Sequence, residues 1–200
     1  MSHLDRRVVR SKEALKQALL QLMRQKDFSA ISITEIVAAA NYNRGTFYSH
    51  YDSKEALLAE FIEDLIQDLL MSFRAPYEHE EIFRIDELTA NSVQIFEHIH
   101  QHATDYTILL RSNVMPQLRE KMFAALKRIS QEELEYAENG IDRELLAHYS
   151  INGLLGLILY WIEGGFQYTP AYMQEQLIKM IHWHPTEAKT RKPGAPPRRS

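Results

Sequence analysis

Hydrogen-bond donors are concentrated in one short segment of the chain, and their types suit contact with a polyanion. Arg44 has a planar guanidinium that can bind the edge of guanine or a phosphate in two places. Thr46, Tyr48 and His50 add neutral donors for phosphate oxygens. Lys54 follows near the expected start of a long helix, whose free amides would join its ammonium in an anion site. The segment therefore indicates binding to nucleic acid.

Two short helices and a tight turn would position these donors. Ser32 and Glu35 have the spacing of a capping box, which predicts a helix that begins directly after the serine. Asn41 and Asn43 then favour a turn, because asparagine tolerates a left-handed backbone and caps a following helix. The second helix is expected over about 44–50. Two short helices joined by such a turn are typical of a helix-turn-helix.

The second short helix has an apolar side and a polar side. Phe47 and Tyr51 lie four residues apart, which predicts that both point inward. Gly45 is a poor helix former, so its presence favours a close approach of the backbone to something bulky such as DNA.

The segment over residues 10–62 resembles the N-terminal domain of the TetR/AcrR family of bacterial transcriptional regulators. The likeness rests on the run GTFYSHYDSKEAL, which follows the turn. Asn41 departs from the glycine that the family often has, and Tyr51 stands where phenylalanine is commoner. By resemblance, Thr46, Tyr48 and Lys54 are phosphate contacts, and Asn43, Arg44 and Gly45 are base-facing. The expected DNA-binding residues are Ser32, Thr34, Asn43, Arg44, Gly45, Thr46, Tyr48, His50 and Lys54.

A looser resemblance covers about 145–180 and points to a Firmicutes-type C-terminal domain of the same family. It rests on the spacing of Gly156, Trp161, Gly165, Phe166, Pro170 and Met173. Membership would imply a homodimer in which the N-terminal domain of each copy, its head, binds a double-stranded DNA operator. A small-molecule effector in the body would change the distance between the heads. The expected function is a repressor released by that effector.

Composition agrees with an all-α fold. The chain has 200 residues, is 45% hydrophobic, and has no cysteine, which excludes disulfides. Strand-like alternation is nowhere sustained. We therefore expect about nine helices, arranged as an N-terminal three-helix helix-turn-helix head and a helical-bundle body for ligand binding and dimerisation. The longer helices are expected over 7–25, 54–73, 86–102, 105–112, 116–138, 142–163 and 170–182.

Charge divides the chain into three expected regions. The head, 1–52, has eight basic and five acidic residues, for a charge of +3. The tail, 185–200, has five basic residues and one acidic residue, for +4, and its proline-rich composition favours disorder. The total charge is −4, so the effector-binding and dimerisation body, 53–184, holds −11. A basic head can still bind phosphate, because charges beyond about 10 Å are screened.

No membrane contact is expected, and the expected location is the cytoplasm. The charged start of the chain lacks the apolar run of a signal peptide. The apolar stretch Ile151–Ile162 is shorter than the roughly 20 residues that cross a bilayer.

That stretch also predicts a dimer interface, because a helix that is apolar on every side must be covered on every side. Glycines in it would let a partner helix come close. The alternative is a core helix of a monomer. The predicted interface residues are Gly153, Gly156, Leu157, Tyr160, Met173 and Leu177.

The body's aromatic and methionine residues define a candidate effector pocket, although such residues at helical spacing are more often plain core. We expect a small, partly apolar effector. The candidate lining is Phe96, Ile99, Tyr106, Met122, Phe123, Tyr149 and Trp161.

Histidines offer a second hypothesis, a zinc-responsive regulator. His98 and His102 share a helix face, and His148 or a carboxylate could complete a site. Glu97 and His100 also form one Glu-x-x-His, but a di-iron bundle enzyme needs that motif twice. Since phosphate-cradling and nucleophile motifs are lacking too, we expect neither an enzyme nor a cofactor.

Overall fold

The computed structural model describes residues 3–79, 81–82, 84, 87–134, 140–183 and 185. Within these ranges the chain forms nine α-helices and no strand, which confirms the all-α prediction. The α-helices are α1 (His3–Met23), α2 (Ile33–Ala39), α3 (Arg44–Tyr48), α4 (Lys54–Arg74), α5 (Ile95–Gln101), α6 (Ala103–Arg111), α7 (Met115–Glu132), α8 (Arg143–Glu163) and α9 (Pro170–Ile181), with short 3₁₀ turns η1 (Phe28–Ala30) and η3 (Ala90–Ser92).

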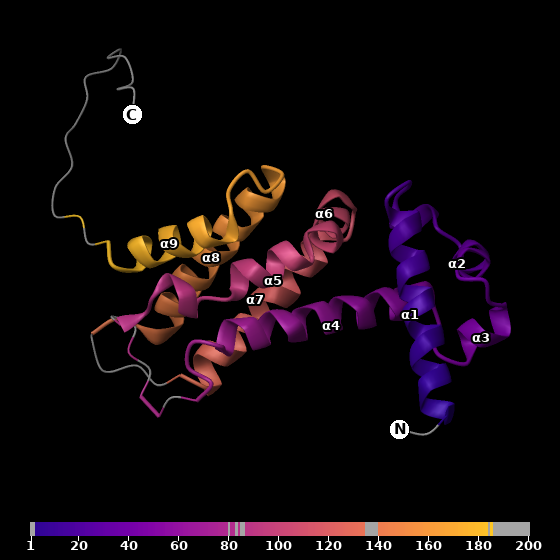
Figure 1. The fold of residues 1–200 in the computed structure, drawn as a ribbon, viewed down its shortest axis with the longest axis horizontal. Helices are drawn as coiled ribbons and strands as arrows, with labels where there is room; N and C mark the ends of the chain where they lie inside the picture. Colours follow the sequence, from indigo (N-terminus) through magenta and orange to yellow (C-terminus); the bar gives the residue numbers. More distant parts are fainter. Residues whose placement is uncertain are drawn as a thin grey trace, which may run out of the picture.

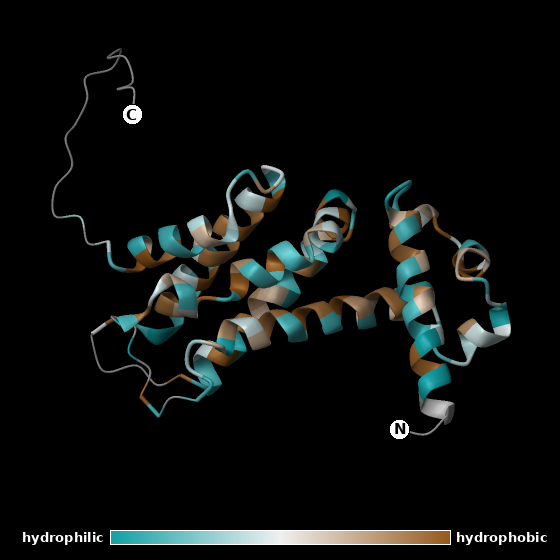
Figure 2. Ribbon diagram, in the orientation of Figure 1, coloured by the Kyte–Doolittle hydropathy of each residue, from teal (hydrophilic) through white to brown (hydrophobic). Residues whose placement is uncertain are grey.

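A head of α1, α2 and α3 lies at one end of the molecule, and α5 to α9 form a body at the other (Figure 1). The long helix α4 leaves the head beside α1 and runs into the body (Figure 1). Its apolar residues continue along most of its length (Figure 2). They are Leu57, Leu58, Phe61, Ile62, Leu65, Ile66, Leu69 and Leu70, all buried. One continuous apolar core therefore joins the head to the body along α4.

Local signals account for several helix boundaries. Ser53, Asp142 and Thr169 cap α4, α8 and α9 with side-chain oxygens that accept from backbone amides three residues on. Proline in the first turn of α7 and of α9 suits a position where no backbone donor is needed.

Two helices of the body are clearly shorter than expected. The helix predicted from residue 86 begins only at Ile95, after η3, and residue 86 lies outside the described ranges. The Val93 carbonyl accepts a 2.6 Å hydrogen bond from the side-chain amide of Gln174 on α9. This tertiary hydrogen bond takes the place of the one that a helix would give the carbonyl. The other, α7, ends at Glu132. Of the predicted tail, 185–200, all but residue 185 lies outside the described ranges.

The apolar stretch read from the sequence, Ile151–Ile162, is shorter than the helix that contains it, α8. By length and composition, this 21-residue helix is the one described helix that could cross a membrane. A core helix of a soluble protein passes the same test. The buried side of α8 carries Ala147, Ile151, Leu155, Ile158, Trp161 and Ile162.

Candidate nucleic-acid interface

A capping box and a left-handed turn set the position of α3. Ser32 accepts from the Glu35 amide at 3.3 Å, and Glu35 Oε2 accepts from the Ser32 amide at 3.0 Å. Hydrogen bonds from Lys26 and then from Ser32 lower the pKa of Glu35 to about 2. Asn41 has a φ of 57°, in the left-handed region. Both sequence predictions, the capping box and the asparagine turn, are confirmed.

Asn43 caps α3. Its Oδ1 accepts from the Thr46 amide at 2.9 Å and from the Thr46 hydroxyl at 3.3 Å. The cap uses the side-chain oxygen of Asn43. The side-chain NH₂ takes no part in the cap and keeps its two donors. A Cβ on Gly45 would come within 3.2 Å of Asn43 Oδ1, so the cap itself gives a reason for glycine there. The expected close approach of DNA to Gly45 stays a prediction.

Apolar anchors hold α3 so that its other side faces outward. Phe47 is fully buried and Tyr51 nearly so, as predicted, with their ring centroids 5.8 Å apart. Tyr48 is 48% exposed. Arg44 Nη2 donates to the Tyr48 hydroxyl at 3.2 Å, and the guanidinium lies 5.7 Å from the Tyr48 ring centroid. Because the tyrosine oxygen accepts in this pair, its own proton remains available to a phosphate.

A polar cleft of about 660 Å³ lies beside this exposed surface, between the start of α1 and α3. Asn43, Thr46 and His50 line it together with Arg7 and with Ser49, which was not among the predicted contacts. Arg7 belongs to the basic start of the first helix, whose cations also suit a phosphate partner. The cleft and the Arg44–Tyr48 pair form one donor-rich surface, which we call the α3 surface.

The other predicted DNA contacts, Ser32 and Thr34, lie at the start of α2. The Ser32 hydroxyl donates to Glu35 Oε2 at 2.8 Å, so the capping box already uses its proton. Thr34 is exposed on the first turn of α2. Contact of either residue with DNA stays a prediction.

Lys54 has a structural role within the head. Its ammonium donates to the carbonyl oxygens of Phe28, Ser29 and Ile31 at 2.9, 3.0 and 2.7 Å. The ammonium also lies 4.7 Å from the Phe28 ring centroid. A lysine has only three donors. Lys54 therefore ties α4 to the end of η1, and its predicted phosphate contact stays a prediction.

His50 is also turned inward. Its Nε2 lies 2.7 Å from the hydroxyl of Ser11, which is buried on α1. The Ser11 hydroxyl can also donate its single proton to the carbonyl of Val8 or Arg7, at 2.9 and 3.0 Å. The Ser11–His50 contact forms in either direction, depending on the tautomer of the imidazole. A phosphate contact through Nδ1 of His50 stays a prediction.

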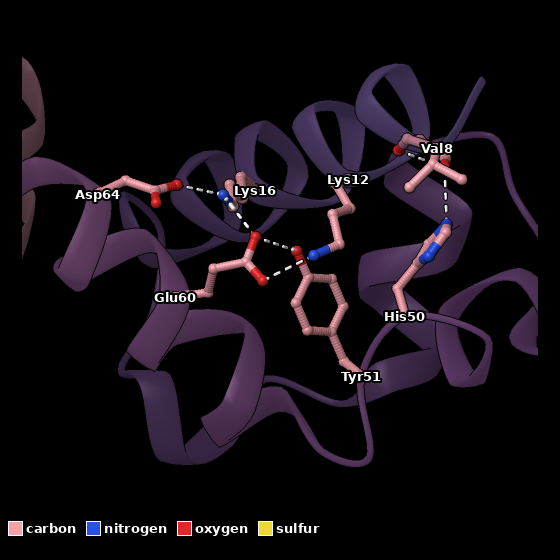
Figure 3. Close-up of polar contacts among 8 residues, drawn as sticks. Val8, Lys12, Lys16, His50, Tyr51, Glu60 and Asp64 are labelled. Atoms are coloured by element: carbon pink, nitrogen blue, oxygen red, sulfur yellow. Dashed lines mark hydrogen bonds and ion pairs between the residues drawn. The ribbon is translucent and has the colours of Figure 1, made fainter. Parts of the chain in front are cut away.

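Charged side chains bind α1 to α4 next to this contact (Figure 3). Glu60 of α4 accepts from Lys12, Lys16 and Tyr51 at 2.8, 2.8 and 3.0 Å. Lys16 also pairs with Asp64. Burial alone would raise the pKa of Glu60, but the hydrogen bonds outweigh it and lower the pKa to about 2. The cluster therefore holds α4 against α1 of the head. It also pairs the Lys12 ammonium with a carboxylate of the protein itself.

The seven candidate effector-pocket residues are mostly packed in the core, and their role stays a prediction. Phe96, Ile99, Tyr106, Met122 and Trp161 are buried core residues, and Phe123 packs 5.0 Å from the ring of His148. Tyr149 is 81% exposed. None of the seven lines the cavity of about 870 Å³ that lies elsewhere in the body.

The metal hypothesis has no support among the described residues. The described residues contain no group of three His, Cys, Asp or Glu side chains that could hold a metal ion. His98 is buried, with Nε2 3.1 Å from the Tyr106 hydroxyl, and its ring centroid lies 4.7 Å from that of His102. Burial, and then the charge of His102, lower the pKa of His98 to about 4. His148 instead contacts Glu144, at 3.2 Å.

The predicted dimer residues lie in different environments. Gly153, Gly156 and Tyr160 are exposed on α8, and a Cβ on either glycine would meet no described atom within 4 Å. Leu157 and Leu177 are half-buried. Met173 is only 2% exposed, so its predicted place at a surface interface is wrong: it packs inside the protomer.

Two short helices, a tight turn and an outward second helix define a helix-turn-helix protein. Residues 15–61 match the family model for bacterial regulatory proteins of the tetR family, and residues 86–182 match a transcriptional regulator C-terminal region. The chain belongs to the TetR family of transcriptional regulators.

Individual relatives agree with this assignment. The HTH-type transcriptional regulator YxbF of Bacillus subtilis is 29% identical over 181 residues, which are 89% of this chain and 46% of the relative. YerO of the same organism is 28% identical over 110 residues, 54% of this chain and 38% of the relative. The chain thus spans less than half the length of these curated relatives. A TetR regulator from Streptococcus agalactiae has the same fold, with a TM-score of 0.59 and 24% identity over 88% of this chain and 96% of its own.

Proposed function

We propose that this protein is a sequence-specific DNA-binding transcriptional regulator that acts as a homodimer. The observation that carries the proposal is the α3 surface, where Arg44, Tyr48 and the Asn43 amide group face outward beside a polar cleft. A guanidinium and an amide can distinguish base edges in the major groove, and hydroxyl donors suit phosphates. Family membership supports the same conclusion.

We further propose residues 1–52 as the DNA-binding domain and 53–184 as the dimerisation and effector-binding domain. The exposed stripe of α8, formed by Leu145, Tyr149, Gly153, Gly156 and Tyr160, supports dimerisation because large apolar side chains flank two open glycines. We place the regulator in the cytoplasm, where a bacterial operator would lie.

The decisive experiment is selection of bound fragments from a pool of random duplexes. We expect a near-palindrome with half-sites about 34–36 Å apart, the spacing at which two heads meet one face of DNA. Affinity should fall steeply between low and physiological salt, because several phosphate contacts release counterions. Recovery of unrelated sequences, or a salt-independent affinity, would contradict the proposal.

The finer proposal is repression that a small-molecule effector relieves. A ligand can shift a DNA-binding equilibrium only if it binds one conformation of the body better than the other. A reporter gene placed behind the selected duplex tests the direction of control. We expect lower expression when the protein is present; higher expression would make it an activator.

A further inference from the structure

The body contains a cavity of about 870 Å³ at the end away from the head, lined by none of the seven candidate residues named above. The last turns of α4 and α7, the N-terminal half of α8, the segment from η3 into α5, and α9 all contribute to its wall. This volume falls in the range of about 300–1,000 Å³ that small-molecule sites occupy. The cavity therefore has the size of a ligand site rather than of a packing defect.

The wall is mainly apolar. Phe73, Ile95, Leu146, Leu154 and Leu177 contribute hydrocarbon surface. The hydroxyls of Ser130 and Ser150 provide neutral hydrogen-bonding groups on α7 and α8. An occupant that buries apolar surface and makes a few hydrogen bonds matches this lining.

Charged groups at the cavity edge already have partners. Glu144 accepts from Lys127 and, at 2.9 Å, from Gln131, and the hydrogen bond from Lys127 lowers its pKa. Asp142 uses Oδ1 to cap α8, and Arg143 is also engaged. A charged ligand would thus lose its hydration without gaining an unpaired counter-charge among the described wall residues.

The cavity also touches the helix that leads to the head. Phe73 of α4 is part of the wall, and its neighbour Arg74 forms a two-point ion pair with Glu133 at the end of α7, at 2.8 and 2.5 Å. An occupant that separates α4 from α7 acts on this ion pair. Since Glu60 binds the other end of α4 to α1, a displacement would reach the head.

We propose that this cavity is the effector site and that it takes an uncharged, mainly apolar small molecule. The inference rests on the proposed regulatory function. The cavity differs from the dimer surface, because Ala147 and Leu154 of its wall lie on the side of α8 opposite Tyr149 and Tyr160. The chain's own residues 186–200 are a poor occupant by composition, since they are basic and rich in proline.

Two matched dyes test the ligand class. N-phenylnaphthylamine is uncharged, and anilinonaphthalenesulfonate has the same rings with an added sulfonate. We expect the full-length protein to bind the uncharged dye more tightly by roughly tenfold or more, because the sulfonate has no free partner in the wall. Equal affinities, or a preference for the sulfonate, would overturn the proposal.

Cavity-filling variants test the location. Ser150→Phe and Ser130→Phe fill the cavity from α8 and from α7, and each should lower affinity for the uncharged dye by roughly tenfold, because the dye loses its space. Tyr160→Ser, on the dimer surface, is the matched control and should leave affinity unchanged. Loss in the control, or full affinity in a folded cavity variant, would overturn the assignment. Dye binding that appears only after removal of residues 186–200 would assign the cavity to the tail instead.

The link to DNA is measured separately with the selected duplex. A saturating uncharged dye should weaken duplex binding by the wild type severalfold and leave Ser150→Phe unaffected. A protein that binds the duplex with the same affinity with and without dye would overturn the regulatory role of the cavity. A protein that binds the dye at this site but no duplex would instead refute the proposed DNA-binding function.

Discussion

Arg44 and Tyr48 lie one helical turn apart on the exposed side of α3, yet their chemistry assigns them different tasks. The tyrosine hydroxyl accepts from the guanidinium and retains its own proton. A hydroxyl donor suits a phosphate, which carries no sequence information. The guanidinium has further donors that fit the edge of guanine.

The first prediction separates these tasks. Tyr48→Phe should weaken binding to every duplex by a similar severalfold factor, because it removes one phosphate donor and keeps the ring. Arg44→Gln should cost about 1–3 kcal/mol on the preferred duplex and also relax preference at one base position. Affinities across a panel of single-base variants of the selected duplex measure both effects. Unchanged preference in Arg44→Gln would remove Arg44 from base recognition.

The second prediction concerns Lys54, which the structure assigns to the fold. Lys54→Met should lower the free energy of unfolding by about 1–3 kcal/mol, because three backbone carbonyls lose their donor. Urea denaturation measures this loss. Lys179→Met is the control, because Lys179 only pairs with Glu175 on the exposed side of α9. Full stability combined with weaker DNA binding would instead support the phosphate role of Lys54.

These residues show which parts of the site the sequence can predict. The capping box of Ser32, the turn at Asn41 and the inward side of Phe47 depend on neighbours within four residues, so local rules place them. His50 bonds Ser11, which is 39 residues away, and Lys54 reaches carbonyls 23 to 26 residues away. Single-sequence patterns do not contain such pairings. The cavity in the body lies away from the seven candidate residues for the same reason, because helix packing decides which apolar residues leave space.

At the scale of elements, α4 is fixed to different partners at its two ends. Glu60 in its first half and Asp64 at its middle bind Lys12 and Lys16 of α1, while Arg74 at its end binds Glu133 after α7. A 21-residue helix spans about 30 Å. It is therefore long enough to transmit a change in the body to the orientation of the head.

The third prediction concerns acid sensitivity of the α1–α4 contact. Glu60 has a pKa lowered from 4.5 to about 2, so its contribution to stability is present above pH 4.5 and is lost as the pH falls toward 2. In Glu60→Gln, the free energy of unfolding should therefore fall less over this window than in the wild type. Urea denaturation at several pH values measures the difference. Glu175→Gln, from an exposed pair on α9, is the control. Identical pH profiles for wild type and Glu60→Gln would contradict the role of this cluster.

At the scale of the whole molecule, one protomer leaves apolar side chains exposed along a single side of α8. Tyr149 is 81% exposed and Tyr160 57% exposed, with Gly153 and Gly156 between them. Apolar surface of this kind marks an interaction site more often than chance exposure does. A second copy of the chain, related by a two-fold axis, would cover it with the same side of its own α8.

The fourth prediction tests that arrangement with Gly156→Glu. The added side chain has space in the protomer, because a Cβ at Gly156 meets no described atom within 4 Å, and replacing a helical glycine removes a cost of up to about 1 kcal/mol. The protomer should therefore stay folded, whereas two buried carboxylates facing each other across the axis should abolish pairing. Sedimentation should show monomers, and affinity for a two-half-site duplex should drop by at least about tenfold, while affinity for a single half-site is retained. Gln117→Glu, on the exposed side of α7, is the control and should remain a dimer. If Gly156→Glu still sediments as a dimer, the two copies meet elsewhere, and the spacing between the heads must be set by a different surface.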